Sequence, residues 1–564
     1  MVGQLPQVLL FLAISFLLLA FVLAFSLSSS WLFLLLIPSA ACFGLRRLAI
    51  RRLQRLKLME TLRGRWGARE VQKERDFQRI AAFFRSNQQP GVIDDRTWQD
   101  LTMDTVFSRL DRTLTWPGVQ VLYSLLRTPE SDELDRLEQR KQVISAFERQ
   151  DAVRERLQVI LSGLQGRGGS ELWELLWNPP ALTPPHPLFL YDIVFVLALL
   201  AAPLIISSSW YTIYILLISY INSRLHARAY QDIRRYVHSV RAVGQLVVAS
   251  AKLARVEAGF LKRFSACCGE AVRKVWFLPL LARSVGAESK QRRLARSIKV
   301  YPNIFFLSEV RGFYRSLRLI QRNREALQKL FLTAGEVDAL LSVASYRTSL
   351  DYFCEPEFTG EQGFELEDAY HPLLAEPVPN SIDLSVRGIL ISGGSMSGKS
   401  TFLRTVGLNV LLAQSIVTCH ARVYKACPLR LITFMDRVES VLEGRGYFLD
   451  EALRVRAAIE AIGQAPTTLV IFDELFRGAS SAERITAASR VLGYLSKRDA
   501  FVLVATHDLE LTKLLGDVYA NFHFSQGGGE SGFQFDYKLK EGPAVVGNAM
   551  ALLRHLGYPE DITM

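Results

Sequence analysis

One short segment, Ser392–Thr401, constrains the fold of this chain more than any other. The fixed positions of the pattern GxxxxGK[ST] are filled by Gly393, Gly398, Lys399 and Ser400. An apolar run over 388–391 precedes the segment and a helix-like run over 401–412 follows it, which is the strand, loop and helix order of a phosphate-binding loop. The pattern alone leaves a plain glycine-rich turn as the alternative.

The loop predicts how a nucleotide would be held. Glycines let backbone N–H groups turn toward phosphate oxygens, and the following helix adds the partial positive charge of its N-terminus. Lys399 is expected to reach the β- and γ-phosphates, and the Ser400 hydroxyl to ligate Mg²⁺. The expected nucleotide-binding residues of the loop are Gly393, Gly394, Ser395, Met396, Ser397, Gly398, Lys399, Ser400 and Thr401.

Two further apolar runs end in ionisable residues. The run over 468–472 leads into Asp473 and Glu474, to which we assign Mg²⁺ binding and orientation of the attacking water. The run over 501–506 leads into His507, which is suited to sensing the γ-phosphate, although an isolated histidine is more often structural. The three elements predict an α/β ABC-type P-loop ATPase that uses ATP and Mg²⁺, with Lys399, Glu474 and His507 as its catalytic residues.

Charge is unevenly distributed along the 564 residues, a length that suits roughly three to four domains. The net charge is +12, yet residues 224–324 carry 22 basic and 5 acidic residues. This excess suits a polyanion or an anionic membrane surface, and a solvated helical face explains it equally well. The six cysteines form no CxxC pair, so neither a disulfide framework nor a zinc site is expected.

Two long apolar stretches predict membrane-spanning hairpins. Residues 8–45 contain no charged residue and divide at a serine-rich turn over 26–30. The arrangement recurs over 187–222, with its turn at 207–210. Basic residues follow both stretches, which indicates cytoplasmic exits. We therefore expect four spans and a multi-pass protein of an inner or plasma membrane, with two buried core hairpins as the alternative.

The complete prediction is a mixed fold with five parts. Helix-period spacing predicts two all-α regions, and the phosphate loop lies in the α/β part. The parts are a first transmembrane hairpin with a basic exit (1–57), a helical region (58–186), a second transmembrane hairpin (187–223), a basic helical lever region (224–350) and the ATPase domain (351–564).

The motifs of the last part resemble those of the MutS mismatch-repair family. They match that family's ATPase motifs in order and spacing at 370–374, 378–380, 392–404, 473–481 and 505–511. The resemblance is specific over 351–564. Weaker similarity to the family's helical core and lever extends over 90–180 and 300–350.

The resemblance implies a homodimer with nucleotide sites at the ATPase interface and helical levers that clamp DNA. It also assigns Asn380 to the nucleotide site. The sequence departs from the family where Gly394 and Ser395 replace the usual Pro-Asn, where Gly446 replaces a serine offered to the partner's nucleotide, and where Pro377 replaces an aromatic residue. The family's mismatch-reading Phe-x-Glu wedge has no counterpart, so mismatch recognition itself is not expected.

The sequence supports three alternative hypotheses about function. The leading hypothesis is a membrane-anchored, dimeric, MutS-like ATPase that binds the DNA backbone through its basic helices. The second is an ATP-driven membrane protein for transport or membrane remodelling. The third is a scaffold with a vestigial ATPase.

Overall fold

The computed structural model describes most of the chain and leaves several internal stretches undescribed. The described residues are 5–27, 36–70, 73–87, 92–130, 133–166, 168–182, 193, 196, 220, 224, 231, 233–282, 285, 308–384, 388–394, 396–435, 447–462, 467–529, 532–544, 558–559 and 561.

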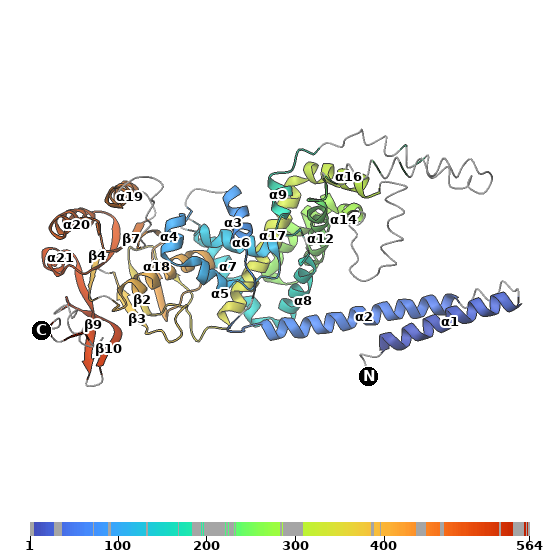
Figure 1. The fold of residues 1–564 in the computed structure, drawn as a ribbon, viewed down its shortest axis with the longest axis horizontal. Helices are drawn as coiled ribbons and strands as arrows, with labels where there is room; N and C mark the ends of the chain where they lie inside the picture. The colour runs from blue at the N-terminus through green and yellow to red at the C-terminus, as the bar shows by residue number, and fades with distance from the viewer. Residues whose placement is uncertain are drawn as a thin grey trace.

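The N-terminal residues form a helical hairpin that extends away from the rest of the molecule (Figure 1). It consists of α1 (Leu5–Leu27) and α2 (Leu36–Arg65), and the Ser39 hydroxyl donates to the Ala13 carbonyl across it at 2.8 Å. The far end of α2 contacts the helical region, where Arg63 pairs with Glu155.

This hairpin corrects the membrane prediction. No helix among the described residues is long and apolar enough to cross a membrane. In α2 the cause is charge, because a run of basic residues begins at Arg46, only ten residues into the helix. The transmembrane hairpins, and with them the multi-pass placement in an inner or plasma membrane, are therefore wrong. The second stretch, 187–223, lies outside the described residues apart from Ile193, Val196 and Tyr220.

The described residues between the hairpin and the sheets are helical. The first group comprises α3 (Phe77–Ser86), α4 (Asp95–Asp100), α5 (Met103–Leu110), α6 (Trp116–Arg127), α7 (Leu134–Arg149), α8 (Asp151–Leu161) and α9 (Leu172–Trp177). The second comprises α12 (Val237–Leu253), α13 (Lys262–Val275), α14 (Leu278–Ala282), α16 (Ser308–Arg322) and α17 (Arg324–Arg347).

Helix α17 is the long central helix of this region and lies against α6 (Figure 1). Its Asp338 is completely buried and accepts hydrogen bonds from Leu114 N (3.0 Å), Thr115 N (2.8 Å) and the Thr115 hydroxyl (2.6 Å) at the start of α6. The carboxylate thus holds the N-cap residue Thr115 in place, and the Thr115 hydroxyl in turn accepts from Gly118 N of α6 at 2.9 Å. The two helices approach closely, since a Cβ at Gly335 would lie 2.8 Å from Pro117 O.

The C-terminal part contains two sheets (Figure 1). The smaller has the order β1-β5-β2-β3, with bounds Glu357–Phe358, Val423–Ala426, Phe364–Ala369 and Asn380–Asp383. The larger has the order β10-β9-β4-β8-β7-β6, with bounds Gly532–Glu541, Ala520–Gly529, Gly388–Ser392, Ala500–Thr506, Thr467–Asp473 and Leu429–Phe434. In the larger sheet every pair is parallel except β9 with β10.

Both faces of the larger sheet are buried, as its nearly continuous apolar strands require. Ile389 and Ile391 share a core with α18 (Lys399–Ile416) and the helical region. Leu390 faces the opposite core, which contains residues of α19 (Tyr447–Ala461), α20 (Ser481–Leu495) and α21 (Leu509–Leu514). Helix α18 contacts α6 and α7, so it joins the sheet to the helical region.

Candidate nucleotide-binding site

Strand register brings the three predicted motifs to one edge of the larger sheet. Ser392, at the end of β4, pairs with Thr506 at the end of β8. Asp473, at the end of β7, pairs with Ala505 of β8. The three strands are adjacent and parallel, so their carboxyl ends meet, which is where α/β folds bind ligands.

The phosphate loop adopts backbone conformations that explain its glycines. Gly393 has φ +152° and Gly398 has φ +105°, in the region that side chains disfavour. A Cβ at Gly393 would also lie 3.0 Å from Phe524 O. Met396 has φ +66° and its side chain is exposed, whereas Ser395 lies outside the described residues.

The phosphate loop also contains Ser397, whose environment differs from that of its neighbours. Its side chain is buried, and its hydroxyl has no hydrogen-bond partner in the described part of the chain. A buried hydroxyl without a partner costs free energy, so it favours a ligand that supplies one.

Lys399, the first residue of α18, folds back over the loop. Its Nζ donates to the carbonyl oxygens of Gly393 and Gly394, each at 2.8 Å. Burial lowers the pKa of Lys399 to about 8, while the charge of Asp473 raises it. The side chain remains largely cationic at neutral pH, as phosphate binding requires.

The remaining predicted catalytic groups form a connected network. His507 Nε2 lies 2.8 Å from Glu474 Oε1 and 3.4 Å from Lys399 Nζ. Burial, followed by the charge of Lys399, lowers the pKa of His507, so the imidazole is neutral at neutral pH. Glu474 has φ +61°, a strained conformation of the kind that clusters at functional sites.

Arg477 completes this network, and sequence reasoning missed it. Its Nε lies 2.8 Å from Glu474 Oε2, and its Nη2 lies 3.4 Å from Asp473 Oδ1. Arg477 follows Asp473 by four residues and Glu474 by three, but these residues form a turn and not a helix, so the helical spacing rule gives no signal for it.

The residues assigned to Mg²⁺ suit that ion chemically. Asp473 is nearly buried at the end of β7, and Ser400 lies in the first turn of α18. A carboxylate and a hydroxyl are oxygen ligands that Mg²⁺ accepts, with water and phosphate completing its shell. No cluster of three or more histidine, cysteine or acidic residues with metal-binding geometry occurs in the described ranges.

Asn380 lies outside the phosphate loop, at the start of β3. Its Nδ2 donates to Tyr537 O at 2.9 Å, and its Oδ1 accepts from Leu539 N at 2.7 Å, so the amide clamps β3 to β10. Asn380 therefore links β3 to β10 in this structure. Gly446, the other position singled out by the resemblance, lies outside the described residues.

The same strand brings an unpredicted aromatic residue to the loop. A Cβ at Gly398 would lie 3.2 Å from Tyr537 Cδ1, and Tyr537 stacks on Phe535 with ring centroids 5.7 Å apart. Tyr537 remains 43% exposed, so it offers an aromatic surface beside the phosphate loop, whereas the sequence suggested that Pro377 left none.

Comparison with known proteins agrees with this geometry. Residues 389–564 match the family model described as MutS domain V. The chain is similar to DNA mismatch repair protein MutS of Natronomonas pharaonis (30% identical over 263 residues), Streptococcus mutans (28% over 266) and Streptococcus equi (28% over 263). Each alignment covers 44% of this chain and 30% of the relative. Over residues 389–564, this chain thus carries the domain that the family model describes as MutS domain V.

Proposed function

We propose that the chain is a Mg²⁺-dependent ATPase whose site lies at the carboxyl edge of β4, β8 and β7. One observation carries the proposal most directly: Lys399, His507 and Glu474 come from three separate motifs and form one connected network. Ionisable groups gathered at a strained turn are typical of functional sites rather than of a purely structural core.

Each residue has a role that follows from its position. Lys399 and the loop N–H groups hold phosphate oxygens, while Ser400 and Asp473 hold Mg²⁺. Bound Mg²⁺ would neutralise phosphate charge. Glu474 orients water for attack, and neutral His507 donates its ring N–H to Glu474. Tyr537 supplies the aromatic surface for the base.

Nucleotide binding is measured by titrating a fluorescent ATP analogue into the full chain. Lys399→Ala is expected to weaken binding at least about tenfold, because a charge-assisted contact to phosphate is lost. Lys513→Ala, an exposed lysine on α21, is the matched control. Equal binding by wild type and Lys399→Ala would refute the assignment of the phosphate loop.

The proposal extends to dimerisation and to DNA. The similarity of residues 389–564 to MutS domain V supports a dimer through the ATPase part. The excess of basic residues over 224–324 supports contact with the DNA backbone. The chain spans about a third of the length of its matched relatives. Within the basic segment, residues 286–307 lie outside the described residues.

Binding to a duplex over a salt series tests the DNA part. Backbone contacts release counterions, so affinity is expected to fall steeply with salt and to differ little between base sequences. Sedimentation with and without ATP measures the dimer. Undetectable duplex binding at low salt would overturn the DNA assignment while leaving the ATPase assignment intact.

A further inference from the structure

Helix α16 carries a stripe of arginines, and it lies at the side of the helical region away from the two sheets (Figure 1). The four arginines are spaced by four, three and four residues, which places them within about 60° of one another around the helix axis. The stripe is about 16 Å long, and the one acidic residue of the helix, Glu309, lies at its start. The arginine stripe consists of Arg311, Arg315, Arg318 and Arg322.

The opposite side of α16 is fixed in the helical core, where the helix contacts α9, α12, α14 and α17. Its buried residues include Val310, Phe313, Tyr314, Leu317 and Ile320. The side chains of Arg315, Arg318 and Arg322 are exposed. Packing of the apolar side therefore holds the arginine stripe in a fixed orientation toward solvent.

The stripe is electrostatically unfavourable for the helix that carries it. Like charges three and four residues apart repel one another and destabilise a helix. Among the residues described, the guanidinium groups of Arg318 and Arg322 find no hydrogen-bond or ion-pair partner that would offset this repulsion. A polyanion lying along the stripe would replace repulsion by attraction.

Basic residues of the neighbouring helix α13 are engaged within the protein. Lys274 pairs with Glu270 at 3.6 Å, and Arg273 Nε donates to Gly269 O at 3.3 Å. Arg263 donates to Gln139. The cations of α13 thus have partners of their own, whereas Arg318 and Arg322 remain available.

The surroundings of the stripe favour duplex DNA among polyanions. A helix that binds a lipid surface inserts apolar side chains, and the large apolar residues named above are buried in the core instead. Phe313 and Tyr314 are among them, so α16 offers no aromatic surface on which unpaired bases could stack. Phosphate groups remain as ligands, and a duplex presents one charge per about 1.7 Å of its axis.

We propose that the arginine stripe of α16 is the surface that holds the backbone of duplex DNA, an inference that rests on the proposed DNA-binding function. Arg318 and Arg322 bind phosphate oxygens, for which the planar guanidinium fork is well suited. Arg311 and Arg315 extend the stripe toward the start of the helix. Phosphate contacts carry no sequence information directly, so binding does not depend on base sequence.

Duplex binding by the full chain over a salt series tests this surface. Each lost phosphate contact lowers the slope of log affinity against log salt by about 0.9, so Arg318→Gln combined with Arg322→Gln should lower it by about two. The same double variant should bind at least about tenfold more weakly at low salt. Arg318→Lys combined with Arg322→Lys keeps both charges and should keep the wild-type slope. Arg273→Gln, an exposed position on α13, is the matched control and should bind like wild type.

Thermal unfolding separates charge from folding, because the glutamine variant should unfold at no lower temperature than wild type once the repulsion is removed. Single-stranded DNA of equal length should bind more weakly than the duplex. Wild-type affinity and slope in the glutamine variant, an equal loss in Arg273→Gln, or equal binding of single-stranded DNA would overturn this inference and leave DNA binding itself intact. Absence of duplex binding by wild type would refute the proposed DNA function as well. Binding to phosphatidylserine vesicles instead of duplex, lost in the glutamine variant, would assign the stripe to lipid.

Discussion

The imidazole Nε2 of His507 lies 2.8 Å from the carboxylate Oε1 of Glu474. Because burial lowers the pKa of His507, the ring is neutral, and its Nε2 lies within hydrogen-bonding distance of the carboxylate. Glu474 also occupies a left-handed backbone conformation at φ +61°. His507 therefore fixes the direction of a side chain whose backbone is already constrained.

Removing the imidazole of His507 should lower the rate of ATP turnover more than it weakens ATP binding. His507→Ala is expected to lower kcat about tenfold to a hundredfold, because misplacement of a catalytic group has effects of that size. The KM for ATP should change much less. Steady-state kinetics measures both, and an unchanged kcat would show that His507 does not position Glu474.

The lowered pKa of Lys399 predicts a pH dependence of nucleotide affinity. The free protein loses the Lys399 proton above about pH 8, while phosphate binding requires that proton. Affinity should therefore be constant below this pH and fall by up to about tenfold per pH unit above it. Titrations of a fluorescent nucleotide from neutral to alkaline pH check this, with Lys399→Ala expected to lack the Lys399-dependent decline. A slope that persists in Lys399→Ala would assign the dependence to another group.

Arg477 competes for the carboxylate assigned to Mg²⁺. Its Nη2 lies 3.4 Å from Asp473 Oδ1 in the nucleotide-free chain. Arg477→Ala should lower the Mg²⁺ concentration for half-maximal ATP turnover by about two- to fivefold, the worth of a partly exposed ion pair. Arg490→Ala on α20 is the exposed control. A higher Mg²⁺ requirement in Arg477→Ala would mean that the guanidinium assists the site.

Stability of the helical region should depend on Asp338. Its completely buried carboxylate accepts from Leu114 N and Thr115 N. Asp338→Ala should lower the free energy of unfolding by about 3 kcal/mol, because two buried donors lose their partner. Denaturant unfolding measures this, with exposed Lys329→Ala on the same helix as control. A loss below about 1 kcal/mol, smaller than one buried unsatisfied donor costs, would contradict this role.

Local patterns predicted the strands and the helix around the phosphate loop. A buried strand, a glycine loop and a helix fixed the position of Lys399, and apolar runs ending at Asp473 and His507 fixed two more strands. These signals are local in sequence. Helix-period spacing likewise predicted the helical character of the region around α6 and α17.

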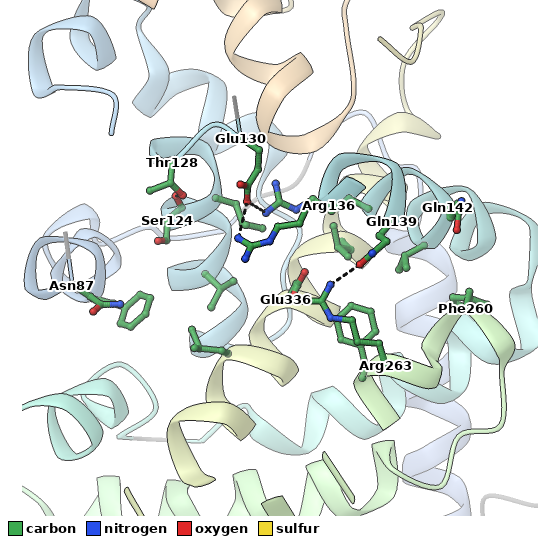
Figure 2. A pocket seen from close by; sticks show the side chains of 18 of the residues that line it. Asn87, Ser124, Thr128, Glu130, Arg136, Gln139, Gln142, Phe260, Arg263 and Glu336 are labelled. Atoms are coloured by element: carbon green, nitrogen blue, oxygen red, sulfur yellow. Dashed lines mark hydrogen bonds and ion pairs between the residues drawn. The ribbon is translucent and has the colours of Figure 1, made fainter. Parts of the chain in front are cut away.

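Contacts between distant segments were not predictable in the same way. The clamp from Asn380 to β10 joins residues 157 apart in the chain, and the approach of Tyr537 to Gly398 likewise joins distant segments. A cavity lined by residues of α3, α6, α7, α13 and α17 arises only where these separate helices meet (Figure 2). Apolar composition over 8–45 was misleading, because it does not show where the charges of α2 fall within the helix.

The central claim is tested most directly by measuring ATP turnover in the presence of Mg²⁺ for the full chain and for Glu474→Gln. Nucleotide binding is measured for the same two proteins. Glutamine keeps the size of the side chain but cannot serve as a carboxylate toward water. We expect wild type to hydrolyse ATP and Glu474→Gln to bind it with similar affinity while turning over at least about a hundredfold more slowly. The exposed control Glu510→Gln on α21 should match wild type. Turnover in Glu474→Gln equal to wild type, or no turnover by wild type, would contradict the account.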